Sequence, residues 1–244
     1  MLPTIDVTNF DIGALLRCGR AIREATRETR TVSEAAAAVT RLLYDVCVNP
    51  GTGERTCALV RFYRTDDYAR LDPSRRAFVT RLLGDMPATP DMKTLVLLAT
   101  VGEEPAWNDP ARSRAHRVIP LPSEEIVRQA PMIAQLIEQF GLEVNEVVRP
   151  AGLLREREGR TYNVFHVPVA LGSPYIPAQE EFVIRYGIQS VVGFGGLLRS
   201  GNLFAVVLFS RVPIPPESAR RFQSLAVDVK GALFFLEEPL ADTD

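Results

Sequence analysis

The chain has few residues of the types that bind metals. Its 244 residues include two histidines, His116 and His166, and three cysteines, Cys18, Cys47 and Cys57. Neither histidine has further ligands at the spacing typical of a zinc site. Three dispersed cysteines also fall short of the four soft ligands that an iron–sulfur cluster normally needs. The sequence therefore predicts no metal site.

Motifs for nucleophilic catalysis and nucleotide binding are also missing. Ser173 in "GSPYIP" lacks the GxSxG turn that exposes a catalytic serine. The glycines of "GFGGLL" (193–198) depart from GxGxxG, and a strand is expected where that motif begins a helix. Small residues there instead predict close packing against the sheet. The "RSRAHR" run (112–117) favours a solvated loop over a phosphate site. No catalytic residue is predicted, and an enzyme acting through His166 is an unfavoured alternative.

One segment combines hydrogen-bonding side chains with aromatic surface. His166, Tyr175 and Gln179 lie in "VFHVPVALGSPYIPAQEEF", where a predicted strand leads through a loop into a predicted helix. Small-molecule pockets pair an apolar wall with a few polar groups. We expect the loop to bring the three towards the sheet face that carries Phe194, with Phe194 and Tyr63 as the wall. These five residues are the candidate ligand-binding residues; the competing interpretation is that they pack the core and order the loop.

Helices are expected first along the chain. Apolar residues repeat at three and four positions from residue 12, which predicts an amphipathic helix reaching about residue 30. "TVSE" (31–34) has the pattern of a capping box and predicts the start of a second helix. A third helix is expected over about 74–83. Prolines at 215 and 216 precede a closing helix with an apolar stripe from Phe222 to Leu236.

The strands are expected in short apolar runs. "TCALVRFYR" (56–64), "TLVLLATVG" (94–102) and "TYNVFHVPV" (161–169) each predict a strand. "SVVGFGGLLRSGNLFAVVLFS" (190–210) predicts a hairpin with a tight turn at "SGN". Because both of its strands are almost continuously apolar, they should be central strands that are covered on both faces.

Residues 103 to about 160 differ from the rest. Prolines at 105, 110, 120, 122 and 131 interrupt this stretch. Only 131–140 has helical periodicity, and Gly141 ends it. "REREGR" (155–160) predicts an exposed turn. We expect this segment to be an insertion on a single domain that spans 1–244, with a core of about 11–237. The elements together predict an α+β fold.

The order of these elements resembles that of a GAF domain, a sensory relative of PAS domains. The resemblance covers about 11–237 and is most specific in "YGIQSVVGFGGLLRSGNLFAVVLFSRVPIPPESARRFQSLAVDV". It implies a central antiparallel sheet with helices from both ends of the chain on one face. A ligand pocket and the insertion would form a layer on the other face.

The chain departs from the specialised GAF domains. The Asn-Lys-Phe-Asp-Glu signature of cyclic-nucleotide GAF domains is absent, and so is the cysteine set of the methionine-sulfoxide-reducing ones. Cys57 is the one plausible attachment point for a bilin, and core packing explains it better. The sequence therefore identifies neither a ligand nor a cofactor.

The resemblance implies a non-catalytic sensory domain that binds a small molecule. Its terminal helices would relay the signal to a separate output domain or protein. The alternative is a dimerisation or protein-interaction module without a ligand. Apolar stripes on the first and last helices predict a homodimer through residues near Leu15, Ile22, Phe222 and Val229.

Composition excludes several other classes of protein. The net charge of -2 gives no electrostatic reason to expect nucleic acid. The apolar runs are shorter than the roughly 20 residues of a membrane helix, so no membrane partner is expected. The first residues lack the pattern of a signal peptide, and the cysteines show no CxxC spacing. Both features predict a cytoplasmic protein with reduced thiols.

Overall fold

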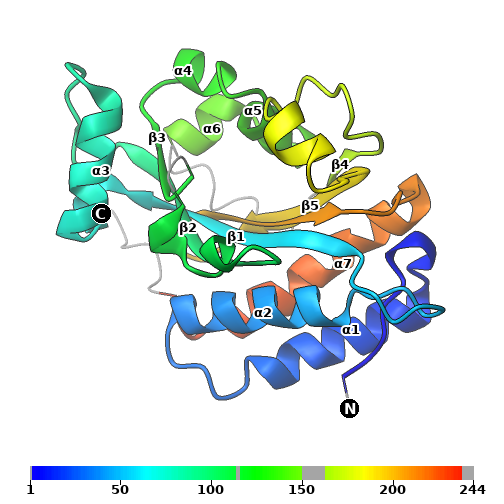
Figure 1. Cartoon of the computed structure of the whole chain (residues 1–244). Coiled ribbons are helices and arrows are strands. Elements are labelled where there is room, and N and C mark those ends of the chain that lie inside the picture. The colour runs from blue at the N-terminus through cyan, green and yellow to red at the C-terminus, as the bar shows by residue number, and fades with distance from the viewer. Residues whose placement is uncertain (1, 114–115, 150–162, 238–244) are drawn as a thin grey trace.

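A curled antiparallel sheet forms the middle of the structure (Figure 1). The computed structural model describes residues 2–113, 116–149 and 163–237. Within them the strand order is β3-β2-β1-β6-β5-β4. The strands are β1 (Cys57–Asp67), β2 (Lys93–Gly102), β3 (Val118–Leu121), β4 (Phe165–Val167), β5 (Ser190–Leu197) and β6 (Leu203–Ser210). All of the pairings are antiparallel, which confirms the predicted α+β class.

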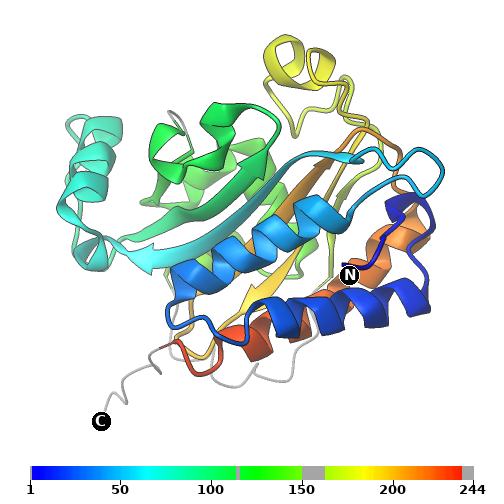
Figure 2. The same ribbon diagram turned by 60° about the horizontal axis from the view of Figure 1, so that its bottom comes forward.

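Helices from both ends of the chain cover one face of the sheet (Figures 1 and 2). They are α1 (Ile12–Ala25), α2 (Val32–Val46) and α7 (Pro216–Leu233). Helices α2 and α7 lie on the strands, and α1 packs against these two helices. We call this side of the sheet the terminal-helix face. The arrangement is the one that the sequence resemblance implied.

The opposite side of the sheet is covered by the segments between β2 and β5, and we call it the insertion face. Its helices are α4 (Glu124–Arg128), α5 (Pro131–Gln139), α6 (Val144–Val148) and a π-helical segment, Gln179–Ile184. The inserted segment also supplies β3, which extends the sheet beyond β2. Helix α3 (Pro73–Leu83) lies beside β3 at this edge. The described residues also include 3-10 turns at Val7–Asn9, Tyr68–Arg70, Pro105–Asn108 and Pro110–Arg112.

The alternation of side chains along the strands separates two apolar cores. On β1, Val60 and Phe62 face the terminal helices, whereas Leu59 and Tyr63 face the insertion. On β6, Leu208 belongs to the first core and Val207 to the second, and both are buried. The prediction of a central hairpin covered on both faces is therefore confirmed.

The caps of the first two helices follow the sequence closely. The Asp11 carboxylate accepts from the Ala14 N–H, and the Thr31 hydroxyl accepts from the Glu34 N–H at 3.1 Å. The Glu34 carboxylate reaches back to the N–H of Arg30, one residue before the cap, so the capping box is confirmed with this shift. Helix α1 ends earlier than predicted, at Ala25, and Thr26 closes it by donating its hydroxyl to the Ile22 carbonyl.

Gly195 on β5 allows a close approach between the sheet and the insertion. A Cβ atom there would overlap the Phe204 carbonyl oxygen and lie 2.8 Å from the ring of Phe140. Phe140, at the end of α5, is fully buried by this contact. The small residues of "GFGGLL" therefore do what the sequence predicted and permit close packing against the strand.

Two predicted elements are shorter or different in the structure. The strand expected over 161–169 is limited to β4, because Pro168 has no N–H to continue the ladder; residues 161 and 162 lie outside the described residues. The helix expected after Pro177 is π-helical, and the Val183 N–H bonds to the Ala178 carbonyl five residues back. The predicted turn 155–160 also lies outside the described residues.

The stripes predicted as a dimer interface instead join α1 to α7 within the chain. Ile22, Phe222 and Val229 are fully buried in the core between the terminal helices and the sheet, so they cannot also contact a partner. Leu15 is partly buried against the same core. The predicted interface residues are therefore corrected.

In the described part of the chain, no helix is both long and apolar enough to cross a bilayer.

Candidate functional site

The insertion face of the sheet has a charged residue near its middle. Arg61 lies between Leu59 and Tyr63 on the same face of β1, and the second core surrounds it. In the ladders, Arg61 is opposite Thr100 on β2 and Val207 on β6. Its Nη1 donates to the Tyr63 hydroxyl at 3.3 Å. The strand thus places a guanidinium group under the insertion.

Two polar atoms in this place have no hydrogen-bond partner among the described residues. They are Nε of Arg61 and the hydroxyl oxygen of Thr100, and both atoms are buried. Thr100 as a whole is only 5% exposed. No carboxylate among the described residues forms an ion pair with Arg61. Since almost all buried polar groups in proteins are paired, this site lacks a polar partner.

His116 lies close enough to Arg61 for the two charges to interact. Desolvation, followed by the positive charge of Arg61, lowers the pKa of His116 from 6.5 to about 4. The residue nevertheless keeps solvent-exposed surface. The imidazole of His116 therefore has protein on some sides and solvent on another. His116 is therefore neutral at pH 7 and offers one donor and one acceptor nitrogen. We call Arg61, Tyr63, Thr100 and His116 the Arg61 cluster.

Aromatic side chains gather on the same face of the sheet. The Trp107 ring centroid lies 4.5 Å from that of Tyr186 and 5.6 Å from that of Phe182, and Phe182 meets Phe209 edge-on at 5.0 Å. The Tyr186 hydroxyl donates to Glu104 at 2.9 Å. These contacts tie the start of the insertion to the π-helical segment and to β6. They form an apolar group on the same face of the sheet as the Arg61 cluster.

The structure places His166 and Phe194 on the terminal-helix face. His166 pairs with Val192, and its Nε2 lies 2.9 Å from the Ile214 carbonyl oxygen. Burial lowers the pKa of His166, and the hydrogen bond to Ile214 opposes this shift. Phe194 is fully buried and packs against Phe222, with ring centroids 6.1 Å apart. Neither side chain lies on the side of the insertion.

The other predicted residues lie on the insertion face. Tyr63 belongs to the second core and Tyr175 packs against it. The Gln179 side chain orders its loop: Nε2 donates to the Ile176 carbonyl at 2.7 Å, and Oε1 accepts from the Gly172 N–H at 2.8 Å.

The five predicted residues are therefore divided between two faces of the sheet. The expectation that the loop brings His166, Tyr175 and Gln179 to the face that carries Phe194 is corrected. His166 lies on that face, whereas Tyr175 and Gln179 lie on the other face, together with Tyr63. The reason is strand alternation, because the neighbours of His166 on β4, Phe165 and Val167, occupy the insertion face.

Sequence reasoning missed Arg61 and Thr100. A signal was present, since Arg61 interrupts "CALVRFY" (57–63), a stretch that is otherwise apolar or aromatic towards both faces. A charge at such a position is rarely buried without a partner. Trp107 was missed because the sequence places it in a proline-rich segment without periodicity.

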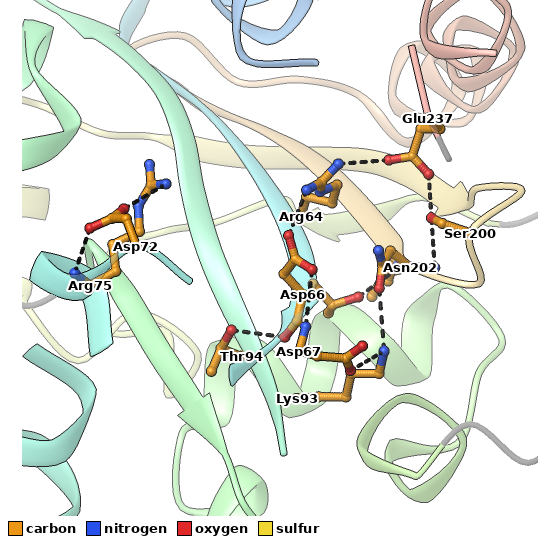
Figure 3. A network of polar contacts seen from close by, with 12 residues as sticks. Arg64, Asp66, Asp67, Asp72, Arg75, Lys93, Thr94, Ser200, Asn202 and Glu237 are labelled. Atoms are coloured by element: carbon orange, nitrogen blue, oxygen red, sulfur yellow. Dashed lines mark hydrogen bonds and ion pairs between the residues drawn. The ribbon is translucent and has the colours of Figure 1, made fainter. Parts of the chain in front are cut away.

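A second polar cluster lies on the terminal-helix face, three residues further along β1 (Figure 3). Arg64 binds the Glu237 carboxylate through Nη1 at 2.8 Å and the Asp66 carboxylate through Nη2 at 2.6 Å. The Ser200 hydroxyl, in the turn between β5 and β6, also donates to Glu237. We call Arg64, Asp66, Ser200 and Glu237 the Arg64 network. It fastens the segment after α7 to the end of the sheet.

Neighbouring residues tie the same end of the sheet together. Lys93, the first residue of β2, lies 2.8 Å from the Asp67 carboxylate and 3.4 Å from the Asn202 side-chain oxygen (Figure 3). The Thr65 hydroxyl accepts from the Leu203 N–H at 2.8 Å. The end of β1, the start of β2 and the β5–β6 turn are therefore held by polar side chains as well as by the ladder.

Comparison with known proteins gives similarity in structure only. No protein-family model matches the chain, and no curated protein sequence matches it. The free methionine-R-sulfoxide reductase of Neisseria meningitidis, solved with its substrate, is 13% identical with a TM-score of 0.49 over 97% of each chain. The GAF domain of an Acinetobacter phosphoenolpyruvate-protein phosphotransferase is 13% identical, with a TM-score of 0.42 over 90% of this chain and 92% of that one.

A third similar structure is the chromophore-binding domain of a bacteriophytochrome from R. palustris. It is 9% identical, with a TM-score of 0.45 over 93% of this chain and 63% of that one. The antiparallel strand order, with helices from both ends of the chain on one face, is the arrangement that the sequence resemblance to GAF domains implied. The fold by itself assigns no ligand and no activity.

Proposed function

We propose that this chain is a sensory domain that binds a small molecule on the insertion face of its sheet. The observation that carries the proposal is the pair of buried, unpartnered polar atoms at Arg61 and Thr100. A bound molecule would supply the missing partners. Pockets for small molecules combine an apolar wall with a few polar groups, and here Trp107 and Phe182 belong to such a wall. Tyr63 and Tyr175 are the sequence-predicted residues that fit this site.

The signal would pass through β1 to the terminal helices. This strand carries the Arg61 cluster on one face and the Arg64 network on the other. In this proposal β1 has two arrangements relative to the terminal helices. A ligand that binds one arrangement more tightly than the other increases the population of that arrangement. Through Glu237 the shift would alter how the end of α7 is held, and a separate output domain or protein would respond to it.

A homodimer is part of the proposal, with an interface different from the one that the stripes predicted. Ile12 and Leu16 lie one helical turn apart on α1 and are 66% and 68% exposed. Val227 on α7 is also exposed. Isolated apolar residues at the surface are ordinary, but a pair on one helix face suits symmetric pairing. A dimerisation module without a ligand would use the same surface.

We also propose that the chain is one domain with its core over about 11–237, and that it works in the cytoplasm. The buried free thiols of Cys18, Cys47 and Cys57 suit a reducing compartment. Burial raises the pKa of Cys18 to about 12, so this thiol is inert and its role is packing.

Native mass spectrometry of the purified protein tests the ligand. We expect an added mass that denaturation releases. Hydrogen exchange is then compared before and after the molecule is removed, and we expect faster exchange in β1 and near Glu237 without it. A protein that carries no added mass and binds none of a set of small carboxylic acids would contradict the sensory proposal and favour the dimerisation module.

A further inference from the structure

We propose that the small molecule carries a carboxylate group and that Arg61 binds it. This inference rests on the proposed function, because it names the chemical class of the ligand for the same site. It is carried by the contrast between Arg61 and two other arginines, Arg64 on the same strand and Arg211 just after β6.

Two other arginines in or next to the central strands have carboxylate partners. Arg64 binds Asp66 and Glu237, and Arg211, just after β6, binds Glu103. Arg64 also leaves its Nε unpaired, but both of its terminal nitrogens are occupied. Arg61 has no ion pair within the described residues. A partly buried guanidinium without an anion is unfavourable, so this site has a place for a negative charge.

The geometry at Arg61 favours a planar anion. Its Nη1 is used by the Tyr63 hydroxyl, which leaves Nε and Nη2 on the other edge without an acceptor among the described residues. Two parallel N–H groups match the two oxygens of a carboxylate. A phosphate would bring up to two negative charges to a site in which Arg61 is the cation of the cluster, so a carboxylate is the better match in charge.

Two hydroxyl groups add donors beside this edge. Thr100 lies directly opposite Arg61 in the ladder, where side chains on one face are about 5 Å apart at Cβ. Its hydroxyl has no partner, so it can donate to a carboxylate oxygen. The Tyr63 hydroxyl accepts from Arg61 and keeps its own proton to donate. The apolar neighbours Leu97 and Val207 would contact the body of the molecule.

The test uses benzoate and acetate as probes, with benzamide and chloride as neutral and ionic controls. Nuclear magnetic resonance of the imidazole of His116 and fluorescence of Trp107, the one tryptophan of the chain, report binding without any assay of activity. We expect saturable changes with a carboxylate at concentrations up to about 100 mM, which suffices even for a millimolar site. The pKa of His116 should rise on binding, because the anion offsets the charge of Arg61.

The Arg61→Gln variant should lose at least about tenfold in affinity for the carboxylate, the loss expected when a charged hydrogen-bonding pair is broken. Arg220→Gln on α7 removes the same charge from an exposed position and should bind as the unaltered protein does. Arg61→Lys keeps the charge but loses the fork, so it should also bind more weakly. Thermal unfolding verifies that each variant is folded, and Arg61→Lys replaces Arg61→Gln if the latter does not fold.

The outcomes separate this inference from the proposed function. A carboxylic acid that is released from the purified protein, and is absent from Arg61→Gln, supports both. A neutral or cationic released molecule, or carboxylate binding that Arg61→Gln leaves unchanged, overturns the carboxylate inference and leaves the sensory function standing. No released molecule, together with no binding of benzoate or acetate, overturns both.

Discussion

Arg61 and Arg64 lie three residues apart on β1 and point to opposite faces of the sheet. Arg64 binds two carboxylates, whereas Arg61 has no carboxylate partner among the described residues. Because one strand carries both side chains, a change at Arg61 would reach the end of α7 without a long chain of contacts. This relationship gives the proposed relay a physical path, and it makes the two arginines differ in what they contribute to stability.

The Arg64 network should stabilise the fold. The Glu237 side chain is only 2% exposed and binds Arg64 at 2.8 Å, so Glu237→Gln leaves a mostly buried guanidinium with one carboxylate fewer. We expect a loss of about 2 kcal/mol in the free energy of unfolding, measured by urea denaturation. Glu217→Gln, which removes an exposed pair with Arg220, is the control and should cost less than about 0.5 kcal/mol. Equal losses in the two variants would contradict the assignment.

Arg61 should have the opposite effect on stability. Its buried Nε has no partner, so replacing Arg61 with Met removes an unfavourable polar burial and keeps most of the side-chain volume. In protein freed of small molecules, we expect Arg61→Met to raise the free energy of unfolding by about 1 kcal/mol. Denaturation in urea measures it, with Arg220→Met as the exposed control. A marked loss of stability would show that Arg61 has a structural role.

Much of the fold could be predicted from local sequence patterns. Helix starts were set by side chains that cap the backbone, as at Asp11 and Thr31. The central hairpin was set by its continuous apolarity. The end of α1 and the π-helical segment were not predicted, because they depend on single hydrogen bonds such as that from Thr26 to Ile22.

The candidate site was harder to predict than the fold. Polar and aromatic residue types in one loop suggested His166 and Gln179, but such types do not reveal the face of the sheet. The register of β4 does, and it turns His166 towards Ile214. Arg61 stood within a strand that was correctly predicted. Its importance depends on the lack of a partner, which is a property of the three-dimensional packing.

The central hairpin should not tolerate a charge on either face. Leu208 is fully buried between β6 and the terminal helices, so Leu208→Asp places an unpaired carboxylate in an apolar core. We expect a loss of more than about 4 kcal/mol, enough to unfold a domain of ordinary stability. Circular dichroism during heating measures it, and Leu82→Asp on the exposed side of α3 is the matched control. A Leu208→Asp protein that melts near the unaltered protein would refute the assigned core.

The exposed side of α1 should control assembly. We expect Leu16→Glu to convert the homodimer to a monomer, because it puts a charge at the centre of the proposed interface, where Leu16 is largely exposed in the single chain. Light scattering measures the mass, and Arg76→Glu at an exposed position of α3 is a control for added negative charge. A monomer mass for the unaltered protein at about 50 µM, well above the Kd of a micromolar dimer, would contradict the homodimer.

Stability should fall in mildly acidic solution, and His116 should be one cause. Its pKa is about 4 in the folded chain, against 6.5 for an unperturbed histidine. Between these values the unfolded chain binds the proton and the folded chain does not, so the free energy of unfolding decreases as the pH falls from about 6.5 to about 4. Above this window the contribution is complete, and below it no further loss comes from this residue.

His116→Gln should therefore reduce the slope of stability against pH, measured by urea denaturation at several pH values. His166 titrates in the same direction and is unchanged in that variant, so part of the slope should persist. A slope identical to that of the unaltered protein would show that Arg61 and desolvation do not hold His116 neutral. With benzoate bound at Arg61, the slope should also decrease, because the anion raises the pKa of His116 towards its unperturbed value.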